Sequence, residues 1–131
     1  MMISSEKKVK VLIADDSSLL RKNLKKLLGT IESIENIIES HSVLSTINQI
    51  RVERPDAVIL DIQLPDGTGM DVLKFIYAHD PKPLAIVLTN FPSENNRKYC
   101  IELGADYFLD KSKEYEQVLH VLENFQGANN E

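Results

Sequence analysis

Short runs of apolar residues alternate with segments of helical periodicity along nearly the whole chain, and this alternation constrains the fold more than any other feature. The runs at 57–60 and 84–88 are continuously apolar, which is typical of strands that are covered on both faces. The segments between the runs are long enough for helices, and Ser17 or Ser18 provides a cap for the first of them. The predicted strands span 9–14, 36–40, 56–60, 84–89 and 106–109, and the predicted helices span 17–28, 42–52, 69–78, 94–103 and 113–125.

Five strands that alternate with five helices predict a parallel sheet with right-handed crossovers and helices on both faces. The number of units favours a flavodoxin-like, doubly wound (βα)5 sheet with the strand order 2-1-3-4-5. A chain of 131 residues has the usual size of one domain. We therefore expect a single α/β domain with its core at about 9–125 and polar termini at 1–7 and 126–131.

The composition argues against several classes of protein. The formal net charge of −5 makes nonspecific binding to nucleic acid through a global positive field unfavourable. No apolar run of the sequence is long enough for a membrane helix, and acids soon interrupt the first run, unlike in a secretory signal. Cys100 is the single cysteine, which excludes an internal disulfide and fits a reducing compartment. We expect a cytoplasmic protein without direct contacts to nucleic acid or membrane.

Charged and polar residues follow the predicted strands, where ligands gather in sheets of this kind. Asp15 and Asp16 follow the first strand, Asp61 follows the third, Thr89 ends the fourth, and Lys111 follows the fifth. Three close carboxylates repel one another, so that one of them must be protonated or a cation must lie among them. Oxygen ligands of this kind suit Mg²⁺, which keeps several waters and often shares its coordination shell with a phosphate.

Together these residue types fit the chemistry of an aspartyl-phosphate. A carboxylate beside the ion can attack phosphorus, the lysine can neutralise the phosphoryl oxygens, and the threonine hydroxyl can bond one of them. Taken singly, the acids after the first strand could cap a helix, Lys111 could be a solvated lysine, and Thr89 could be an ordinary strand residue. Only their joint placement at successive strand ends favours the functional interpretation.

From about Val9 to Phe125 the chain resembles the receiver domains of two-component response regulators. The matching segments are "VLIADDS", "VILDIQLPDGTGMDVL", "IVLTN" and "GADYFLDKS". The resemblance implies that Asp61 is the phosphoacceptor and that it binds Mg²⁺, with Mn²⁺ as an alternative ion. The other implied ligands are Asp16, Asp15 directly or through water, and the backbone carbonyl of Gln63.

The resemblance also implies roles for residues around the phosphoryl group. Lys111 would pair with that group, Thr89 would turn inward to bond it, and Phe108 would occupy the aromatic switch position, although Phe108 could also be a plain core aromatic. Gly69 would be the small residue that the family requires in the loop after the phosphoacceptor.

The implied function is a phosphorylation-dependent switch that catalyses only its own phosphorylation and dephosphorylation. A histidine kinase or a phosphotransfer protein would donate the phosphoryl group. The face formed by the fourth helix, the fifth strand and the fifth helix would then change for a downstream protein partner. The cognate kinase, the oligomeric state and the choice between a stand-alone receiver and a domain of a longer regulator remain open. The first predicted helix carries a basic stripe, which is either a solvated face or a docking surface for an acidic partner: Arg21, Lys22, Lys25 and Lys26.

Two departures from the family pattern and two tuning positions concern the phosphoryl group. Ser112 follows Lys111 where the family has proline, and without proline a cis peptide bond costs about 3 kcal/mol. Asn90 stands where the family has alanine or glycine, and its larger side chain would narrow the approach to the phosphoacceptor. Gln63 and Phe91 hold the two positions that tune access of the hydrolytic water, and we expect the bulky Phe91 to lengthen the lifetime of the phosphoryl group.

Two other classes of function remain as alternatives. A Mg²⁺-dependent phosphatase of the haloacid dehalogenase type also has an aspartate nucleophile at a strand end. That family places a second aspartate two residues later, where this chain has Gln63. The other alternative is a receiver fold used as a phosphorylation-independent binding module; such chains usually lack one of the acids or the lysine, all of which are present here.

Overall fold

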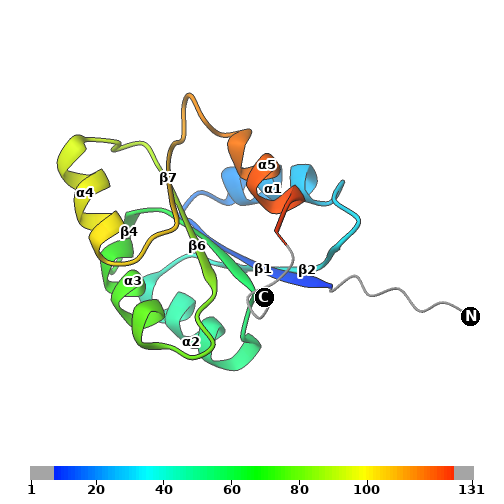
Figure 1. Cartoon of the computed structure of the whole chain (residues 1–131), viewed down its shortest axis with the longest axis horizontal. Helices are drawn as coiled ribbons and strands as arrows, with labels where there is room; N and C mark the ends of the chain where they lie inside the picture. Colours follow the sequence, from blue (N-terminus) through cyan, green and yellow to red (C-terminus); the bar gives the residue numbers. More distant parts are fainter. Residues whose placement is uncertain (1–7, 126–131) are drawn as a thin grey trace, which may run out of the picture.

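The computed structural model describes residues 8–125, and a five-stranded parallel sheet lies at its centre (Figure 1). The strands are β1 (Val9–Ala14), β2 (Ile34–Ser40), β3 (Ala57–Leu60), β4 (Gln63–Leu64), β5 (Gly67–Thr68), β6 (Leu84–Thr89) and β7 (Tyr107–Asp110). The helices are α1 (Ser18–Leu28), α2 (Val43–Glu53), α3 (Gly69–Ala78), α4 (Glu94–Glu102) and α5 (Gln117–Glu123). The predicted polar termini at 1–7 and 126–131 lie outside the described residues.

The strand order of the sheet is β2-β1-β3-β6-β7, and all neighbouring strands are parallel. Strands β4 and β5 form a separate antiparallel hairpin. When the hairpin is left out, the order is the expected 2-1-3-4-5 of a flavodoxin-like doubly wound sheet. The fold class predicted from the alternation of strands and helices is therefore confirmed.

The main differences from the prediction concern β2, α5 and the β4–β5 hairpin. Strand β2 begins at Ile34, two residues before the predicted start at 36. Helix α5 begins at Gln117 rather than at 113, because the chain first turns after β7: the carbonyl of Asp110 accepts hydrogen bonds from the N–H groups of Lys113 and Glu114. The β4–β5 hairpin was not predicted, since strands of two residues are too short to show any periodicity.

Helices cover both faces of the sheet (Figure 1). Leu12 of β1 packs on the side of α2, α3 and α4, whereas Ile13, the next residue, packs on the side of α1 and α5. This alternation explains why the strand sequences are continuously apolar, because both faces are core. Cys100 of α4 is fully buried, and burial raises the pKa of its thiol to about 11. Four of the buried polar or charged residues lie at strand ends, namely Asp15, Ser40, Asp61 and Thr89, and Thr46 lies on α2.

None of the helices within residues 8–125 has the length and apolar character needed to cross a membrane.

Candidate functional site

Three charged side chains meet at the carboxyl ends of β1, β3 and β7. The ammonium Nζ of Lys111 lies 2.9 Å from Oδ2 of Asp15 and 2.9 Å from Oδ2 of Asp61. The exposed fractions of the three side chains are only 13% for Lys111, 5% for Asp15 and 10% for Asp61. Two buried carboxylates thus share one cation, and we call these three residues the acidic centre.

Burial and charge act in opposite directions on the acidic centre. Burial raises the pKa of Asp15 and outweighs the hydrogen bonds from Lys111 and from the N–H of Ser17, which lower it. Burial also acts to lower the pKa of Lys111, but the hydrogen bonds and the charges of Asp15 and Asp61 outweigh it, so that this pKa is raised. Lys111 therefore stays protonated at neutral pH and offsets the negative charge of the centre.

The position of Asp61 is set by its buried strand and by the loop that follows. Its N–H donates to the carbonyl of Ala14 at 3.0 Å, and its Oδ1 accepts from the N–H of Gln63 at 3.3 Å. A Cβ atom at Gly69 would collide with the carbonyl oxygen of Asp61. The expected need for a small residue at Gly69 thus has a direct cause, since the loop returns against its own backbone.

The predicted cluster of three carboxylates is not formed. Asp15 is buried, and its Oδ1 accepts from the N–H of Ser17 at 2.8 Å, whereas Asp16 is exposed. Within residues 8–125 no three His, Cys, Asp or Glu side chains are grouped so that they could hold a metal ion. In this structure Asp16 is therefore not grouped with the other two acids, and its role as a metal ligand stays a prediction. Both acids follow the end of β1, and the chain bends at Asp16, so the two side chains have different surroundings.

The donor chemistry of the acidic centre nevertheless fits a small divalent cation. Mg²⁺ usually takes one or two protein carboxylates and completes its coordination with water. Asp15 and Asp61 already have a positively charged group between them, and Gln63 follows Asp61 by two residues. The residues present could thus hold Mg²⁺ with oxygen ligands alone.

Thr89 lies at the same edge of the sheet as the acidic centre. It is fully buried at the end of β6, and its carbonyl accepts from the N–H of Lys111 at 2.8 Å. The hydroxyl Oγ1 of Thr89 accepts from the N–H of Phe91 at 3.0 Å, which leaves its own hydrogen available for donation. The next turn is closed by Asn96, whose Nδ2 donates to the carbonyl of Phe91 at 2.9 Å.

Asn90, which departs from the family pattern, and Phe91 lie in this turn. Asn90 is exposed, and Phe91 is 47% exposed. The cis peptide bond of residues 8–125 is Asp80–Pro81, so that the bond between Lys111 and Ser112 is trans, as expected.

Phe108 and Tyr107 take opposite positions on β7. Phe108 is buried, with an exposed fraction of 3%, whereas Tyr107 is 42% exposed. The guanidinium carbon of Arg97 on α4 lies 4.9 Å from the centroid of the Phe108 ring, within the range of a cation–π contact. The ring therefore lies inward, and its role as a switch stays a prediction.

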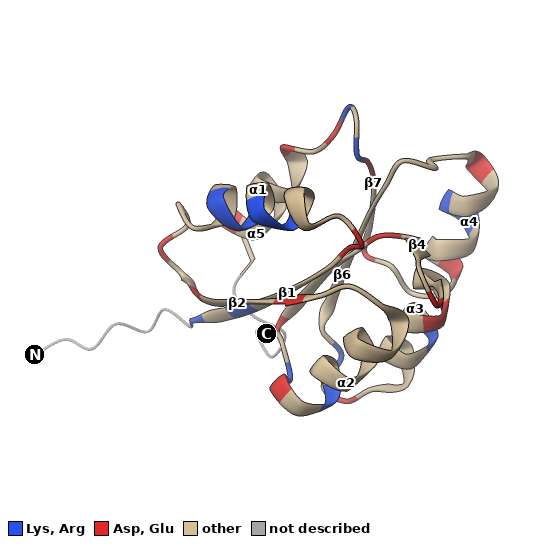
Figure 2. Cartoon of the chain, turned by 180° about the vertical axis from the view of Figure 1, so that it is seen from behind, with Lys and Arg blue, Asp and Glu red and all other residues tan. Residues whose placement is uncertain are grey.

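Arg21 contributes to the site in a way that the sequence did not indicate. Its Nη1 donates to the carbonyl of Asp15 at 2.6 Å, and its Nε donates to Oε1 of Glu39 at 3.0 Å. Lys25 also bonds Glu39, at 3.4 Å. Figure 2 shows the basic residues of α1 in blue. Part of the predicted stripe is thus used within the molecule, and these contacts depend on tertiary structure alone.

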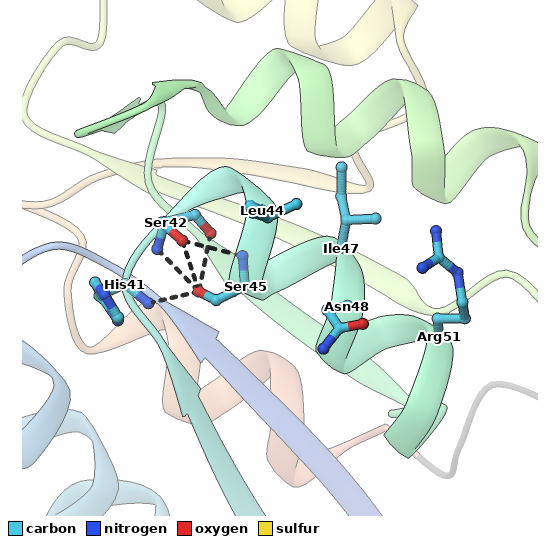
Figure 3. Close-up of a pocket in the computed structure, with 7 residues that line it drawn as sticks. All are labelled: His41, Ser42, Leu44, Ser45, Ile47, Asn48 and Arg51. Carbon is cyan, nitrogen blue, oxygen red and sulfur yellow. Dashed lines mark hydrogen bonds between the residues drawn. The ribbon is translucent and has the colours of Figure 1, made fainter.

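A groove of about 560 Å³ lies on α2 and shares no residue with the acidic centre (Figure 3). Its lining residues are His41, Ser42, Leu44, Ser45, Ile47, Asn48 and Arg51.

An acidic centre at the carboxyl ends of a doubly wound parallel sheet is the arrangement expected of a receiver domain. Comparison with known families agrees: the model of the response regulator receiver domain matches residues 11–123. The chain belongs to the response regulator receiver domain family.

The chain is similar to part of several longer proteins. It is 36% identical over 118 residues to the transcriptional regulatory protein BtsR of Salmonella typhi, covering 87% of this chain and 48% of that protein. It is 30% identical over 103 residues to the DNA-binding transcriptional activator DevR/DosR of Mycobacterium tuberculosis, covering 79% and 48%. It is 34% identical over 110 residues to a protein-glutamate methylesterase/protein-glutamine glutaminase of Desulfotalea psychrophila, covering 82% and 30%. The chain thus spans half or less of the length of these relatives.

Solved structures show the same fold. The signal receiver domain of a putative Luxo repressor protein from Vibrio parahaemolyticus has a TM-score of 0.81 and 28% identity, covering 88% of this chain and 87% of that one. The response regulator domain of Thermotoga maritima CheB has a TM-score of 0.80 over 95% of this chain and 99% of that one. At 24% identity, this second likeness concerns the fold alone.

Proposed function

We propose that this domain is a phosphorylation-dependent switch and that Asp61 accepts its phosphoryl group from a histidine kinase or a phosphotransfer protein. The single observation that supports this most strongly is the pair of 2.9 Å contacts from Lys111 to Asp15 and Asp61. A surface acid would not need this arrangement, whereas a phosphoacceptor needs a nearby cation for the charge that it receives.

In the proposed transfer, an oxygen of the Asp61 carboxylate forms a bond to phosphorus while the bond between phosphorus and the donor histidine breaks. Lys111 is then placed to pair with the phosphoryl oxygens, and the hydroxyl hydrogen of Thr89 can be donated to one of them. Mg²⁺, or Mn²⁺ in its place, would neutralise the phosphoryl oxygens when bound. Asp61, Asp15, Asp16 and the carbonyl of Gln63 would hold it, and Asp16 would have to turn toward the centre.

The output of the switch would be the face formed by α4, β7 and α5. Movement of Thr89 toward a phosphoryl group would pull on Phe91, and Asn96 connects this residue to α4. Arg97, on the same helix, covers Phe108. A shift from mostly inactive to mostly active requires about 3–5 kcal/mol of differential binding, which a few charge-assisted hydrogen bonds can supply.

We propose no separate enzymatic activity for the domain, and we place its work in the cytoplasm, where a reducing environment suits the unpaired Cys100. A downstream protein would recognise the output face, without direct contacts to nucleic acid. We further propose 1–131 as one receiver domain, whether it acts alone or within a longer regulator.

Incubation with Mg²⁺ and a small phosphodonor, followed by intact-mass measurement, tests the proposed function. We expect one phosphoryl adduct in the wild-type protein and none in Asp61→Asn. Asp110→Asn is a matched control, because this nearby acid bonds Ser112 rather than Lys111, and it should keep the adduct. Turnover of the donor without an adduct would indicate a phosphatase instead, and neither adduct nor turnover would indicate a passive binding module.

A second experiment concerns the donor protein. Lys22 and Lys26 are exposed on α1, and the side chain of Lys25 is 53% exposed. These lysines could attract an acidic donor and increase its association rate. We expect the pair Lys22→Glu and Lys25→Glu to slow phosphotransfer from the kinase but not from the small phosphodonor. Unchanged transfer from the kinase would exclude the stripe as a docking surface and leave it a solvated face.

A further inference from the structure

Asp66 lies at the tip of the β4–β5 hairpin, outside the acidic centre, and its side chain contacts α2. Its Oδ1 accepts a hydrogen bond from the backbone N–H of Val43 at 2.7 Å, and its Oδ2 accepts one from Leu44 at 3.0 Å. Both N–H groups belong to the first turn of α2, where helical N–H groups have no partners within the helix. The contact joins segments 23 and 22 residues apart, so it is more than the local turn chemistry that an aspartate usually supplies.

The contact completes a cap that α2 itself supplies only in part. The hydroxyl of Ser42 accepts from the N–H of Ser45 at 3.0 Å, and the hydroxyl of Ser45 accepts from the N–H of Ser42 at 3.2 Å (Figure 3). The N–H groups of Val43 and Leu44 lie between these residues, and Asp66 binds both. A carboxylate is favoured at this place by the positive end of the helix dipole. The hairpin and α2 are therefore joined at a defined point.

The hairpin is a short connection between this point and the acidic centre. Gln63 pairs with Thr68 and Leu64 pairs with Gly67, while the N–H of Gly69 donates to the carbonyl of Ile62 at 2.6 Å. At the other end of the hairpin, the N–H of Gln63 donates to the carboxylate of Asp61. A displacement of the tip would therefore be transmitted to Asp61 through the pairs Leu64–Gly67 and Gln63–Thr68.

Gly67 shows how closely the tip fits between the helices. Its φ is +158°, and a Cβ atom there would lie 3.2 Å from Cγ2 of Val43 on α2 and 3.2 Å from Oδ2 of Asp71 on α3. The tip thus packs against α2 at Gly67 and is bonded to it at Asp66, which leaves it little freedom to shift.

We propose that Asp66 is a positioning residue for the acidic centre: by bonding the first turn of α2 it holds the hairpin, and thereby the carbonyl of Gln63 and the carboxylate of Asp61, in place for Mg²⁺. The metal readout of this inference rests on the proposed function, whereas the anchoring of the hairpin does not.

Two variants of Asp66 and one matched control test the inference. Asp66→Ala removes both acceptors, and Asp66→Asn keeps one acceptor oxygen with nearly the same shape. Ser42→Ala removes a cap of the same helix but leaves the contact of the hairpin intact, so it reports what mere weakening of α2 does. Each unphosphorylated protein is titrated with Mg²⁺ by calorimetry, and hydrogen exchange of the amides at 43–44 and 63–69 is measured without metal.

We expect Asp66→Ala to weaken Mg²⁺ binding about tenfold, at the lower end of the effect of residues that orient metal ligands, and Asp66→Asn to weaken it less. We also expect faster exchange at 63–69 in Asp66→Ala, and Mg²⁺ affinity within about twofold of the wild type in Ser42→Ala. Unchanged affinity or unchanged exchange in Asp66→Ala would overturn the inference, as would an equal loss of affinity in Ser42→Ala. A wild-type protein that binds no Mg²⁺ would instead overturn the metal step of the proposed function, and the exchange rates would still decide whether Asp66 anchors the hairpin.

Discussion

Replacing Lys111 with methionine would leave two buried carboxylates without the cation that they share. At 2.9 Å and an effective dielectric constant of about 20, each pair gains about 6 kcal/mol of Coulomb energy, most of which offsets the desolvation of the charges. Removing one partner of a buried pair typically costs about 3–5 kcal/mol. The cost has an upper limit, because one of the two carboxylates can take up a proton instead of staying charged. Protonating an ordinary carboxyl at pH 7 requires about 4 kcal/mol. We therefore expect Lys111→Met to lower the free energy of unfolding by about 3–4 kcal/mol at pH 7 without divalent cations.

The loss of Lys111 also determines how the free energy of unfolding changes with pH. Burial already raises the pKa of Asp15 in the wild-type protein. Removing Lys111 also removes the hydrogen bond and the positive charge that lower this pKa. A carboxyl whose pKa is higher in the folded state than in the unfolded state binds protons on folding, so that stability increases as the pH falls. The deficit of Lys111→Met should thus shrink between about pH 7 and pH 5.

Urea unfolding followed by circular dichroism measures this effect. Lys113→Met is the matched control, because Lys113 is exposed in the same turn, and it should unfold like the wild type. Mg²⁺ should restore part of the stability of Lys111→Met, since it supplies the missing positive charge. A loss below about 1 kcal/mol at pH 7, or an equal loss at both pH values, would refute the view that Lys111 compensates the two buried charges.

Four further predictions concern other parts of the molecule. The hydrogen bond from Arg21 lowers the pKa of Glu39, so the contribution of this ion pair is present above the ordinary carboxyl pKa and lost as the pH falls through the lowered one. Glu39→Gln should therefore cost less than about 1 kcal/mol in urea unfolding at pH 7, and nothing in high salt, because the pair is partly exposed. Cys100 should not react with a thiol reagent at pH 8 until urea unfolds the protein; rapid labelling of the native state would contradict its burial. Gly69→Ala should destabilise the fold by about 1–3 kcal/mol, and a variant as stable as the wild type would show that the loop can move away from the colliding backbone. Phe91→Ala should lose its phosphoryl group faster than the wild type in an autodephosphorylation assay, and an equal or slower loss would reject the expected shielding by this ring.

Much of the fold could be predicted because it depends on local patterns of apolar and polar residues. The apolar runs at 57–60 and 84–88 are strands in the structure, and their continuity follows from burial on both faces. The number of βα units also predicted the strand order that the structure has. Elements with weak local patterns were missed or misplaced, as shown by the β4–β5 hairpin and by the late start of α5.

The candidate site was only partly predictable. Asp15, Asp61 and Lys111 could be expected together, because the carboxyl ends of parallel strands meet at one edge of the sheet. Asp16 was expected with them, but the sequence pattern does not say which of two consecutive acids is directed toward the centre and which is exposed.

The sequence by itself determined the class of fold and the edge at which the charged residues gather, because these depend on periodicity and on the strand after which each residue falls. Only the tertiary structure decided that one ammonium group lies between two buried carboxylates, that Arg21 bonds the backbone of Asp15, and that Asp66 caps a distant helix. The physical reason is that hydrogen bonds and ion pairs depend on distances of about 3 Å. Such distances between residues far apart in the chain are set by the packing of the helices on the sheet, which no local pattern encodes.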